Sequence, residues 1–193
     1  HYFTKKSYVP VDVCLLMDAS GSMAGDKRQA ACYLAEHLLL TGKEKVAVVT
    51  FQERSSEVVV PFTRSQHILR TGLSKITPAG LTPLAEGIMT AVNLIKNSPV
   101  RNPLLVLITD GIPNTPLWTM DAKADALKAA TYIDEGKIRF ICIGVESNRF
   151  YLEKVVECGQ GALYLVDDLN KDNLINIVRW EKKNMLNVDK MRA

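Results

Sequence analysis

Apolar runs of strand length alternate with segments of helical period along almost the whole chain. Four runs are long and continuous enough to be strands buried on both faces: Val11–Met17, Val46–Phe51, Leu104–Ile108 and Ile138–Val145. The segments between and after them predict helices at Lys27–Leu40, Gln66–Ile76, Leu84–Lys96, Ala122–Glu135, Tyr151–Cys158 and Asn170–Asn184. Strands that alternate with helices favour right-handed crossovers and a mostly parallel sheet.

Two further runs complete the predicted sheet. Glu57–Phe62 contains a proline, which favours an edge strand paired as a hairpin with Val46–Phe51, and Ala162–Val166 is typical of a sixth strand. The expected fold class is therefore α/β: a doubly wound, mostly parallel six-stranded sheet with one antiparallel edge strand and helices on both faces. Residues 1–193 are expected to form one domain, with a core of about residues 9–180 and a basic tail at 181–193 that is the least committed part.

Composition excludes several classes of protein. The net charge is +3 and the 24 Lys and Arg are spread among 21 acidic residues, so nucleic acid is not an expected partner. A membrane is not expected either, because no apolar run approaches the roughly 20 residues that span a bilayer. The four cysteines lie far apart without a Cys-x-x-Cys pair, which favours reduced, buried thiols and a cytoplasmic location. A chain that begins at His1 rather than Met suggests a segment of a longer protein.

Short oxygen-bearing side chains occur at three places in the connections between predicted strands and helices. The first strand ends in MDASGSM, which presents Asp18, Ser20 and Ser22, and Gly21 is expected to let the backbone turn sharply between the two serines. The sequence ITDG places Asp110 after a later strand, and the stiff loop PAGLTPL presents Thr82 before a helix. In a doubly wound sheet the carboxyl ends of the strands meet in one crevice, where ligands bind.

This set of two carboxylates and three hydroxyls contains no His or Cys. Such ligands suit a hard cation, and Mg²⁺ takes about six oxygens near 2.1 Å and usually keeps several waters. The expected cofactor is one Mg²⁺, with Mn²⁺ or Ca²⁺ possible, and the expected ligands are Asp18, Ser20, Ser22, Thr82 and Asp110. An ion held by neutral hydroxyls is left electron-poor and partly open, so it attracts an acidic side chain from another molecule.

Other interpretations of the same residues remain open. Asp18, Ser20 and Ser22 also suit a helix N-cap, Asp110 a plain turn, and Thr82 a cap before a proline. A metal-dependent phosphatase would use Asp18 as nucleophile, but it normally has a second Asp where this chain has Ser20. A serine hydrolase needs a Gly-x-Ser-x-Gly elbow, and a P-loop ATPase needs Gly-x4-Gly-Lys-Ser/Thr; neither string occurs. The phosphoryl-transfer enzyme is the alternative to a non-enzymatic binding module.

MDASGSM, GLTPL and ITDG, in this order and within this alternation of elements, resemble the metal-ion-dependent adhesion site (MIDAS) of von Willebrand factor A (VWA) domains. The resemblance implies a Rossmann-like VWA fold, with Ser20, Ser22 and Thr82 near the metal while Asp18 and Asp110 act largely through water. DASGSMAG, FTRSQHILRTGLSKI, TPLAEGI and CGQGALYLVDDLNKDNL are similar to the carboxyl-terminal domain of magnesium chelatase D subunits. This narrower resemblance implies a protein partner such as an AAA+ ATPase subunit, and a non-catalytic role in that assembly.

Trp118 lies in the proline-rich loop PNTPLWTM directly after Asp110. Aromatic side chains are enriched at interface hot spots, so Trp118 is a candidate contact for the partner. The other interpretation is that its ring folds down as a lid on the core.

Overall fold

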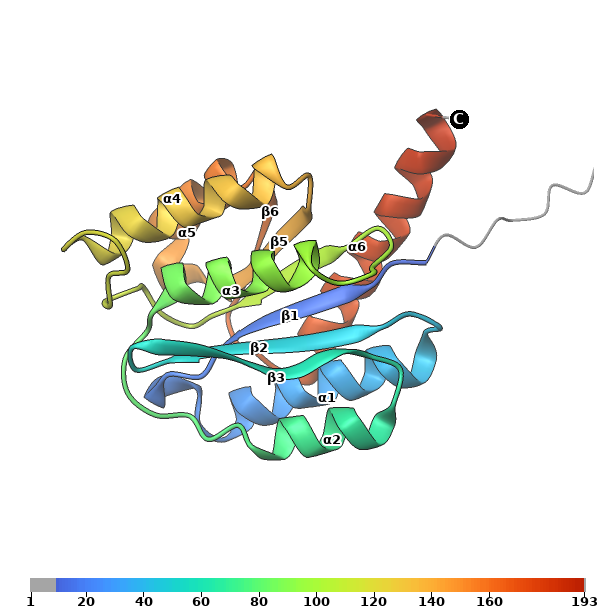
Figure 1. Ribbon diagram of the computed structural model, residues 1–193, viewed down its shortest axis with the longest axis horizontal. Coiled ribbons are helices and arrows are strands. Elements are labelled where there is room, and N and C mark those ends of the chain that lie inside the picture. Colours follow the sequence, from blue (N-terminus) through green and yellow to red (C-terminus); the bar gives the residue numbers. More distant parts are fainter. Residues whose placement is uncertain (1–9, 193) are drawn as a thin grey trace, which may run out of the picture.

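The computed structural model describes residues 10–192 of the chain, with side chains described for residues 10–185. Six strands form one sheet in the order β3-β2-β1-β4-β5-β6 (Figure 1). The strands are β1 (Val13–Asp18), β2 (Val46–Gln52), β3 (Ser55–Thr63), β4 (Leu104–Ile108), β5 (Arg139–Val145) and β6 (Ala162–Val166). Five of them run parallel, and only β3 is antiparallel to its neighbour β2. The predicted fold class is confirmed.

Six helices within residues 10–192 cover the sheet. They are α1 (Asp26–Thr41), α2 (Gln66–Ser74), α3 (Leu84–Lys96), α4 (Ala122–Glu135), α5 (Arg149–Cys158) and α6 (Lys171–Arg192), with short 3₁₀ turns η1 (Gly21–Met23) and η2 (Glu146–Asn148). The bounds of β4, β6, α3 and α4 are those expected from the sequence. The prediction that the last helix ends at Asn184 is wrong, because α6 continues to Arg192.

The alternation of side chains along the central strand explains the two layers of helices. Val13 and Leu15 of β1 lie in one buried cluster together with residues of α1, α2 and α6, whereas Cys14 and Leu16 lie in a second cluster with residues of α3, α4 and α5. Each face of the sheet is thus covered by its own helices (Figure 1). This arrangement explains why the central strands are apolar on both faces rather than alternating.

The edge strand β3 behaves as its proline predicted. Pro61 lies within Ser55–Thr63, which pairs with β2 on one side and lies at the edge of the sheet. The register between the two strands shifts twice between Val46 and Val49. Pro61 has no backbone N–H to donate, and at an edge this removes nothing from a neighbouring strand.

All four cysteines are free thiols, as expected. Cys14 and Cys142 are fully buried in the central strands β1 and β5, while Cys32 and Cys158 are only half-buried. Burial raises the pKa of the Cys14 thiol to about 12 and raises the pKa of Cys142 as well. The thiols of β1 and β5 are therefore small apolar core groups.

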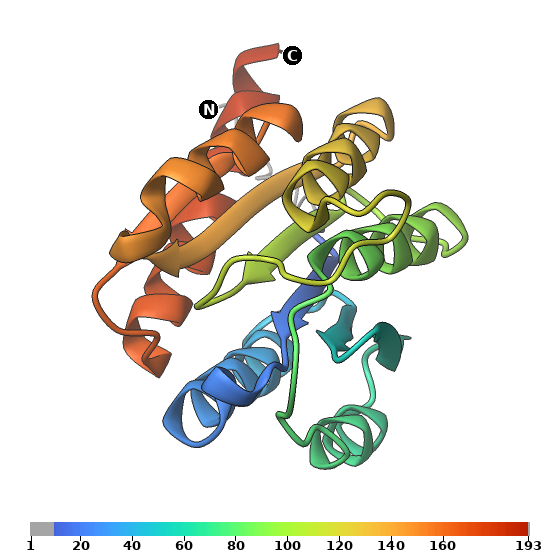
Figure 2. The same cartoon turned by 90° about the vertical axis from the view of Figure 1, so that its left-hand side faces the viewer.

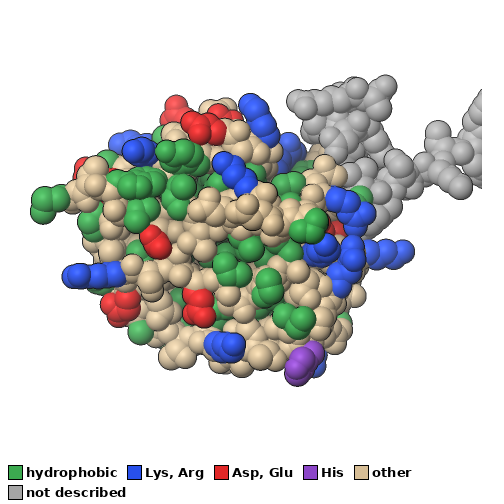
Figure 3. Space-filling model, viewed as in Figure 1, with side chains coloured by type: hydrophobic (Ala, Val, Ile, Leu, Met, Phe, Trp, Pro, Cys, Tyr) green, Lys and Arg blue, Asp and Glu red, His purple; other side chains and the backbone are tan. Residues whose placement is uncertain are grey.

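Some basic residues that are distant in sequence come together at one end of the molecule. Figure 3 shows several Lys and Arg side chains side by side at its right-hand end, where β1 and β2 begin. Arg64 donates to the carbonyl of Lys43, and Lys45 donates to the carbonyl of Pro99, so these loops are in contact. Basic residues that are spread along the sequence therefore lie near one another at this edge, which is opposite the carboxyl ends of the strands.

Candidate metal centre

The candidate residues lie where the strand order of the sheet reverses. β1 pairs with β2 on one side and with β4 on the other, so the chain leaves the ends of β1 and β4 toward opposite halves of the sheet. Figure 2 shows the carboxyl edge of the sheet, where the segments after these two strands lie next to each other. Asp18 is the last residue of β1, and Asp110 follows β4 by two residues. This position is the usual ligand crevice of a doubly wound sheet.

Asp18 forms the buried floor of the site, with none of its surface exposed. Its Oδ1 accepts a hydrogen bond from the Ser20 backbone N–H at 2.8 Å, and its Oδ2 accepts one from the Thr109 hydroxyl at 2.7 Å. Burial raises the pKa of Asp18 above its usual value and the negative charge of Asp110 adds to this, although hydrogen bonds from Ser20 and Thr109 act in the opposite direction. A carboxylate in such surroundings is stabilised by a nearby cation.

Ser20, Ser22 and Asp110 are in direct contact. The Oγ atoms of the two serines are 3.3 Å apart, and the Ser22 hydroxyl donates to Asp110 Oδ1 at 2.8 Å. Ser20 is only 4% exposed, whereas Ser22 lies at the exposed rim. The structure thus brings together the two serines from one loop and the aspartate from another.

The loop after β1 contains a 3₁₀ turn and, after it, a glycine with positive φ. The two glycines with positive φ in the described chain are Gly25, at 82°, and Gly80, at 70°. Gly21 instead begins the 3₁₀ turn η1, and a Cβ added to it would lie 3.7 Å from the Gly80 nitrogen, an ordinary contact. The backbone thus turns between the two serines at Gly21 without a positive φ, and the left-handed conformation lies at Gly25, directly before α1.

The loop that carries Thr82 is held to the loop after β1 by backbone hydrogen bonds. The N–H of Ala79 donates to the carbonyl of Ala19 at 2.9 Å, and the N–H of Gly21 donates to the carbonyl of Gly80 at 3.2 Å. Thr82 itself is 6% exposed. The loop before α3 is thereby joined to the loop after β1, which places Thr82 beside the segment that carries the two serines.

Sequence reasoning missed two residues that fix the carboxylate and the threonine. Thr109 orients Asp18 through its hydroxyl, and Asn114 accepts a hydrogen bond from the Thr82 backbone N–H at 2.8 Å through its Oδ1. Thr109 lies within ITDG and Asn114 three residues after it, but nothing in their spacing distinguishes them from ordinary loop residues. Their roles depend on partners 91 and 32 positions away in the sequence.

A third missed residue is Lys27, in the first turn of α1. Its Nζ lies 2.7 Å from Asp110 Oδ2 and 3.4 Å from the carbonyl oxygen of Ser22. The Lys27 side chain is 34% exposed and that of Asp110 is 3% exposed. Asp110 is thus held through both oxygens, by the Ser22 hydroxyl and by the Lys27 ammonium.

Trp118 is placed along α4 by the loop that follows Asp110. Its ring centroid lies 6.3 Å from that of Tyr132, and Lys128 Nζ lies 4.8 Å from its centre. The loop is fixed by the buried Asp125, whose Oδ2 accepts hydrogen bonds from three successive backbone N–H groups, those of Leu117, Trp118 and Thr119. Trp118 is 42% exposed, so its ring partly covers α4 and is partly open to solvent.

The donor set fits a small hard cation. In an octahedral site with metal–oxygen distances near 2.1 Å, neighbouring ligand oxygens lie about 3.0 Å apart, close to the 3.3 Å between the two serine hydroxyls. Within the described chain, no group of three or more His, Cys, Asp or Glu could hold a metal ion. The five candidate residues offer two carboxylates, and their other three oxygens are hydroxyls.

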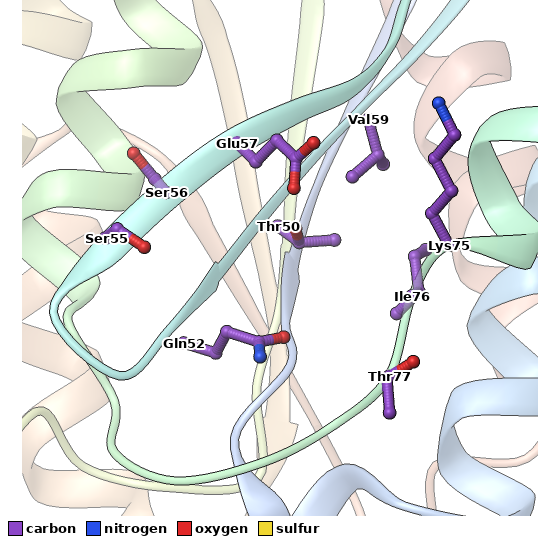
Figure 4. Close-up of a pocket in the computed structure, with 9 residues that line it drawn as sticks. All are labelled: Thr50, Gln52, Ser55, Ser56, Glu57, Val59, Lys75, Ile76 and Thr77. Atoms are coloured by element: carbon purple, nitrogen blue, oxygen red, sulfur yellow. The ribbon is translucent and has the colours of Figure 1, made fainter.

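A polar hollow of about 180 Å³ lies elsewhere, on the face of the sheet edge formed by β2 and β3 (Figure 4). Thr50, Gln52 and Glu57 line it from the strands, and Lys75 and Thr77 line it from the segment after α2. None of the five candidate metal residues is part of its lining.

Over the described residues, no helix is long and apolar enough to cross a bilayer.

Comparison with known proteins gives a family and a fold. The pattern of the von Willebrand factor type A domain matches residues 13–112. The chain is 40% identical over 107 residues to an uncharacterised protein of Mycobacterium tuberculosis, covering 51% of this chain and 17% of that protein. It is 32% identical over 111 residues to the magnesium-chelatase 67 kDa subunit of Heliobacterium mobile, covering 54% of this chain and 17% of that subunit. The chain therefore spans about a sixth of the length of these relatives.

Among solved structures, the chain is similar to the von Willebrand factor type A protein from Catenulispora acidiphila. The TM-score is 0.71 at 19% identity, and the match covers 90% of this chain and 42% of the other. At this identity the likeness concerns the fold.

Proposed function

Because the chain belongs to the von Willebrand factor type A domain family, we propose that it is a non-enzymatic, metal-dependent protein-binding module, and that residues 1–193 form one domain. In this proposal one Mg²⁺, or Mn²⁺ or Ca²⁺ in its place, is held by Asp18, Ser20, Ser22, Thr82 and Asp110. The bound ion would supply a Lewis-acidic position that accepts an Asp or Glu side chain of a partner.

The observation that carries the proposal is the hydrogen-bonded row Ser20, Ser22 and Asp110, with Oγ–Oγ and Oγ–Oδ1 distances of 3.3 and 2.8 Å. These three proposed ligands come from two different connections, and Ser22 contacts both of the others. Asp18 lies beneath them with a pKa raised by burial, so a cation would relieve an unfavourable buried charge. The chain's own residues would bind and orient the ion and the partner's carboxylate, and no covalent bond would be made or broken.

The alternative phosphoryl-transfer function is less compatible with the position of Asp18. A nucleophilic carboxylate must present one oxygen to the substrate, but both oxygens of Asp18 accept hydrogen bonds and its surface is fully buried. An assay with an aryl phosphate and Mg²⁺ separates the two functions. Turnover that Asp18→Asn abolishes would contradict the binding-only role.

The metal site is tested by calorimetric titration with Mg²⁺ and Mn²⁺. We expect one site in the wild-type domain, and no binding in the double variant Ser20→Ala, Ser22→Ala. The matched control is Thr41→Ala, Ser98→Ala, which removes two hydroxyls that donate to helix carbonyls at the ends of α1 and α3, opposite the crevice. Circular dichroism spectra of both double variants must match the wild type. Unchanged metal binding in the crevice variant would refute the proposed site.

The proposed partner is an acidic protein surface, with an AAA+ ATPase subunit as one candidate. The support is the similarity to a subunit of a magnesium chelatase, although that relative is matched over only 17% of its length. The half-exposed ring of Trp118, held on α4 beside Lys128, offers an aromatic contact next to the carboxyl edge of the sheet. Co-purification of the full-length protein with its partners in Mg²⁺ and in EDTA tests this, and equal recovery in EDTA would contradict it.

A further inference from the structure

Lys27 is a cation within the candidate metal centre, and it contacts a residue assigned to the metal. Its Nζ lies 2.7 Å from Asp110 Oδ2, and Asp110 Oδ1 is taken by the Ser22 hydroxyl. The lysine and the serine come from the same short segment, five residues apart. Both carboxylate oxygens of Asp110, in the loop after β4, therefore contact donors from the single segment between β1 and the start of α1.

The position of Lys27 is electrostatically unusual for a helix. It is the second residue of α1, where the exposed backbone N–H groups give the helix end a partial positive charge. A lysine in the first turn is disfavoured by this charge. The contact with Asp110 at 2.7 Å compensates for it.

A charge count shows what this lysine does to the site. The five candidate ligands include two carboxylates, Asp18 and Asp110, which together carry a charge of about −2 when ionised. A divalent cation alone would bring such a site to neutrality. With Lys27 present, the loaded site carries one positive charge in excess, and one carboxylate from a partner would neutralise it.

On the basis of the proposed function, we infer that Lys27 couples the metal to the acidic partner: its ammonium weakens metal binding to the free domain and strengthens binding of a carboxylate to the loaded site. Lys27 is a specificity-determining residue in this inference and not a metal ligand. It favours an anionic group over a neutral oxygen such as a water or an amide carbonyl in the open position. Metal and partner then bind with positive coupling, since each relieves the unfavourable charge left by the other.

The test compares Lys27→Gln and Lys27→Arg with the wild type by Mn²⁺ titration in chloride and in acetate at equal ionic strength. Acetate is the carboxylate probe. In chloride we expect Lys27→Gln to bind Mn²⁺ about tenfold more tightly, because a like charge within a few ångströms is removed. Acetate should increase the Mn²⁺ affinity of the wild type and of Lys27→Arg, but not that of Lys27→Gln. The control is Lys154→Gln, which makes the same change in net charge on an exposed part of α5.

The outcomes separate this inference from the proposed function. If the wild type and Lys27→Gln bind Mn²⁺ with the same affinity and the same response to acetate, the role of Lys27 is refuted while the metal site stands. If the wild type binds neither Mn²⁺ nor Mg²⁺, the proposed function fails, and the coupling fails with it. Thermal denaturation in EDTA tests the ion pair in the absence of metal. The melting temperature of Lys27→Gln should be lower than that of Lys154→Gln. Equal melting temperatures would show that the contact of Lys27 with Asp110 does not stabilise the domain.

Discussion

Thr82 and Asn114 hold each other through two hydrogen bonds across the carboxyl edge of the sheet. The backbone N–H of Thr82 donates to Asn114 Oδ1 at 2.8 Å, and the backbone N–H of Asn114 donates to the carbonyl of Thr82 at 3.2 Å. This reciprocal pair joins the loop before α3 to the loop after β4. Thr82 therefore depends on Asn114 for its position beside the two serines.

Replacing Asn114 is expected to weaken metal binding without unfolding the domain. Asn114→Ala leaves the buried Thr82 N–H without its acceptor, which costs about 1–3 kcal/mol and allows the loop to move. We expect weaker Mg²⁺ binding in a calorimetric titration, whereas Asn114→Asp keeps the acceptor oxygen and should stay close to the wild type. Wild-type affinity in Asn114→Ala would show that Thr82 is positioned by other contacts.

A side chain at Gly80 is expected to destabilise the loop before α3. The φ of Gly80 is 70°, and an added Cβ would meet the carboxylate end of Glu53, so Gly80→Ala combines backbone strain with a displaced side chain. We expect a loss of about 1–3 kcal/mol in a urea denaturation experiment. Gly21→Ala is the matched control, because its added Cβ makes only an ordinary contact at 3.7 Å. Equal stability of the two variants would contradict this account of the loop.

Asp125 makes the stability of the loop after β4 sensitive to acid. Its burial acts to raise its pKa, but hydrogen bonds from Thr119, Leu117 and Trp118 outweigh this and lower the pKa to about 2. A carboxyl group with a lowered folded pKa adds stability above its unfolded pKa of about 3.9, and this stability is lost as the pH falls toward 2. We expect Asp125→Asn to be less stable than the wild type at pH 7.

The measurement for Asp125 is urea denaturation of both proteins at several pH values. The difference in unfolding free energy between wild type and Asp125→Asn should shrink as the pH falls from about 4 to about 2. Asp121→Asn is the comparison, since Asp121 is an exposed N-cap of the same helix. A difference for Asp125→Asn that stays constant over this range would contradict the assignment.

Tyr164 ties α6 to the edge strand β6. Its hydroxyl donates to Glu181 Oε2 at 2.7 Å, and Arg139 Nε lies 3.4 Å from Glu181 Oε1. Tyr164→Phe removes one hydrogen bond to a charged group, and we expect a loss of about 1.5–3 kcal/mol in a denaturation experiment. Tyr33→Phe, on the exposed side of α1, should change stability far less.

The same contact predicts a dependence on alkaline pH. Burial first, and then the hydrogen bond and negative charge of Glu181, raise the pKa of Tyr164 to about 12. A phenol whose folded pKa is raised adds stability that is fully present below its unfolded pKa of about 10 and is lost as the pH rises through 12. The stability difference between wild type and Tyr164→Phe should therefore decrease above pH 10, and no change there would contradict it.

The sequence determined the sheet and its two helical layers. Continuous apolar runs such as Leu104–Ile108 indicated strands buried on both faces, and Pro61 indicated an edge strand; both were confirmed. These features could be predicted because the spacing of apolar residues and the missing N–H of proline act locally along the chain. The end of the last helix could not be predicted in this way, because the sequence near Asn184 contains no strong helix-terminating residue and α6 continues to Arg192.

The sequence also identified the five candidate ligands, because each follows a strand or starts a helix and all carry oxygen. Only the tertiary structure decided how they are held. Thr109, Asn114 and Lys27 are ordinary loop and helix residues in the sequence, and they become part of the site through partners far away along the chain. Local patterns determine which residues reach the edge of the sheet, whereas hydrogen bonds and charges between separate connections, such as Lys27 on Asp110, depend on how strands and loops pack in space.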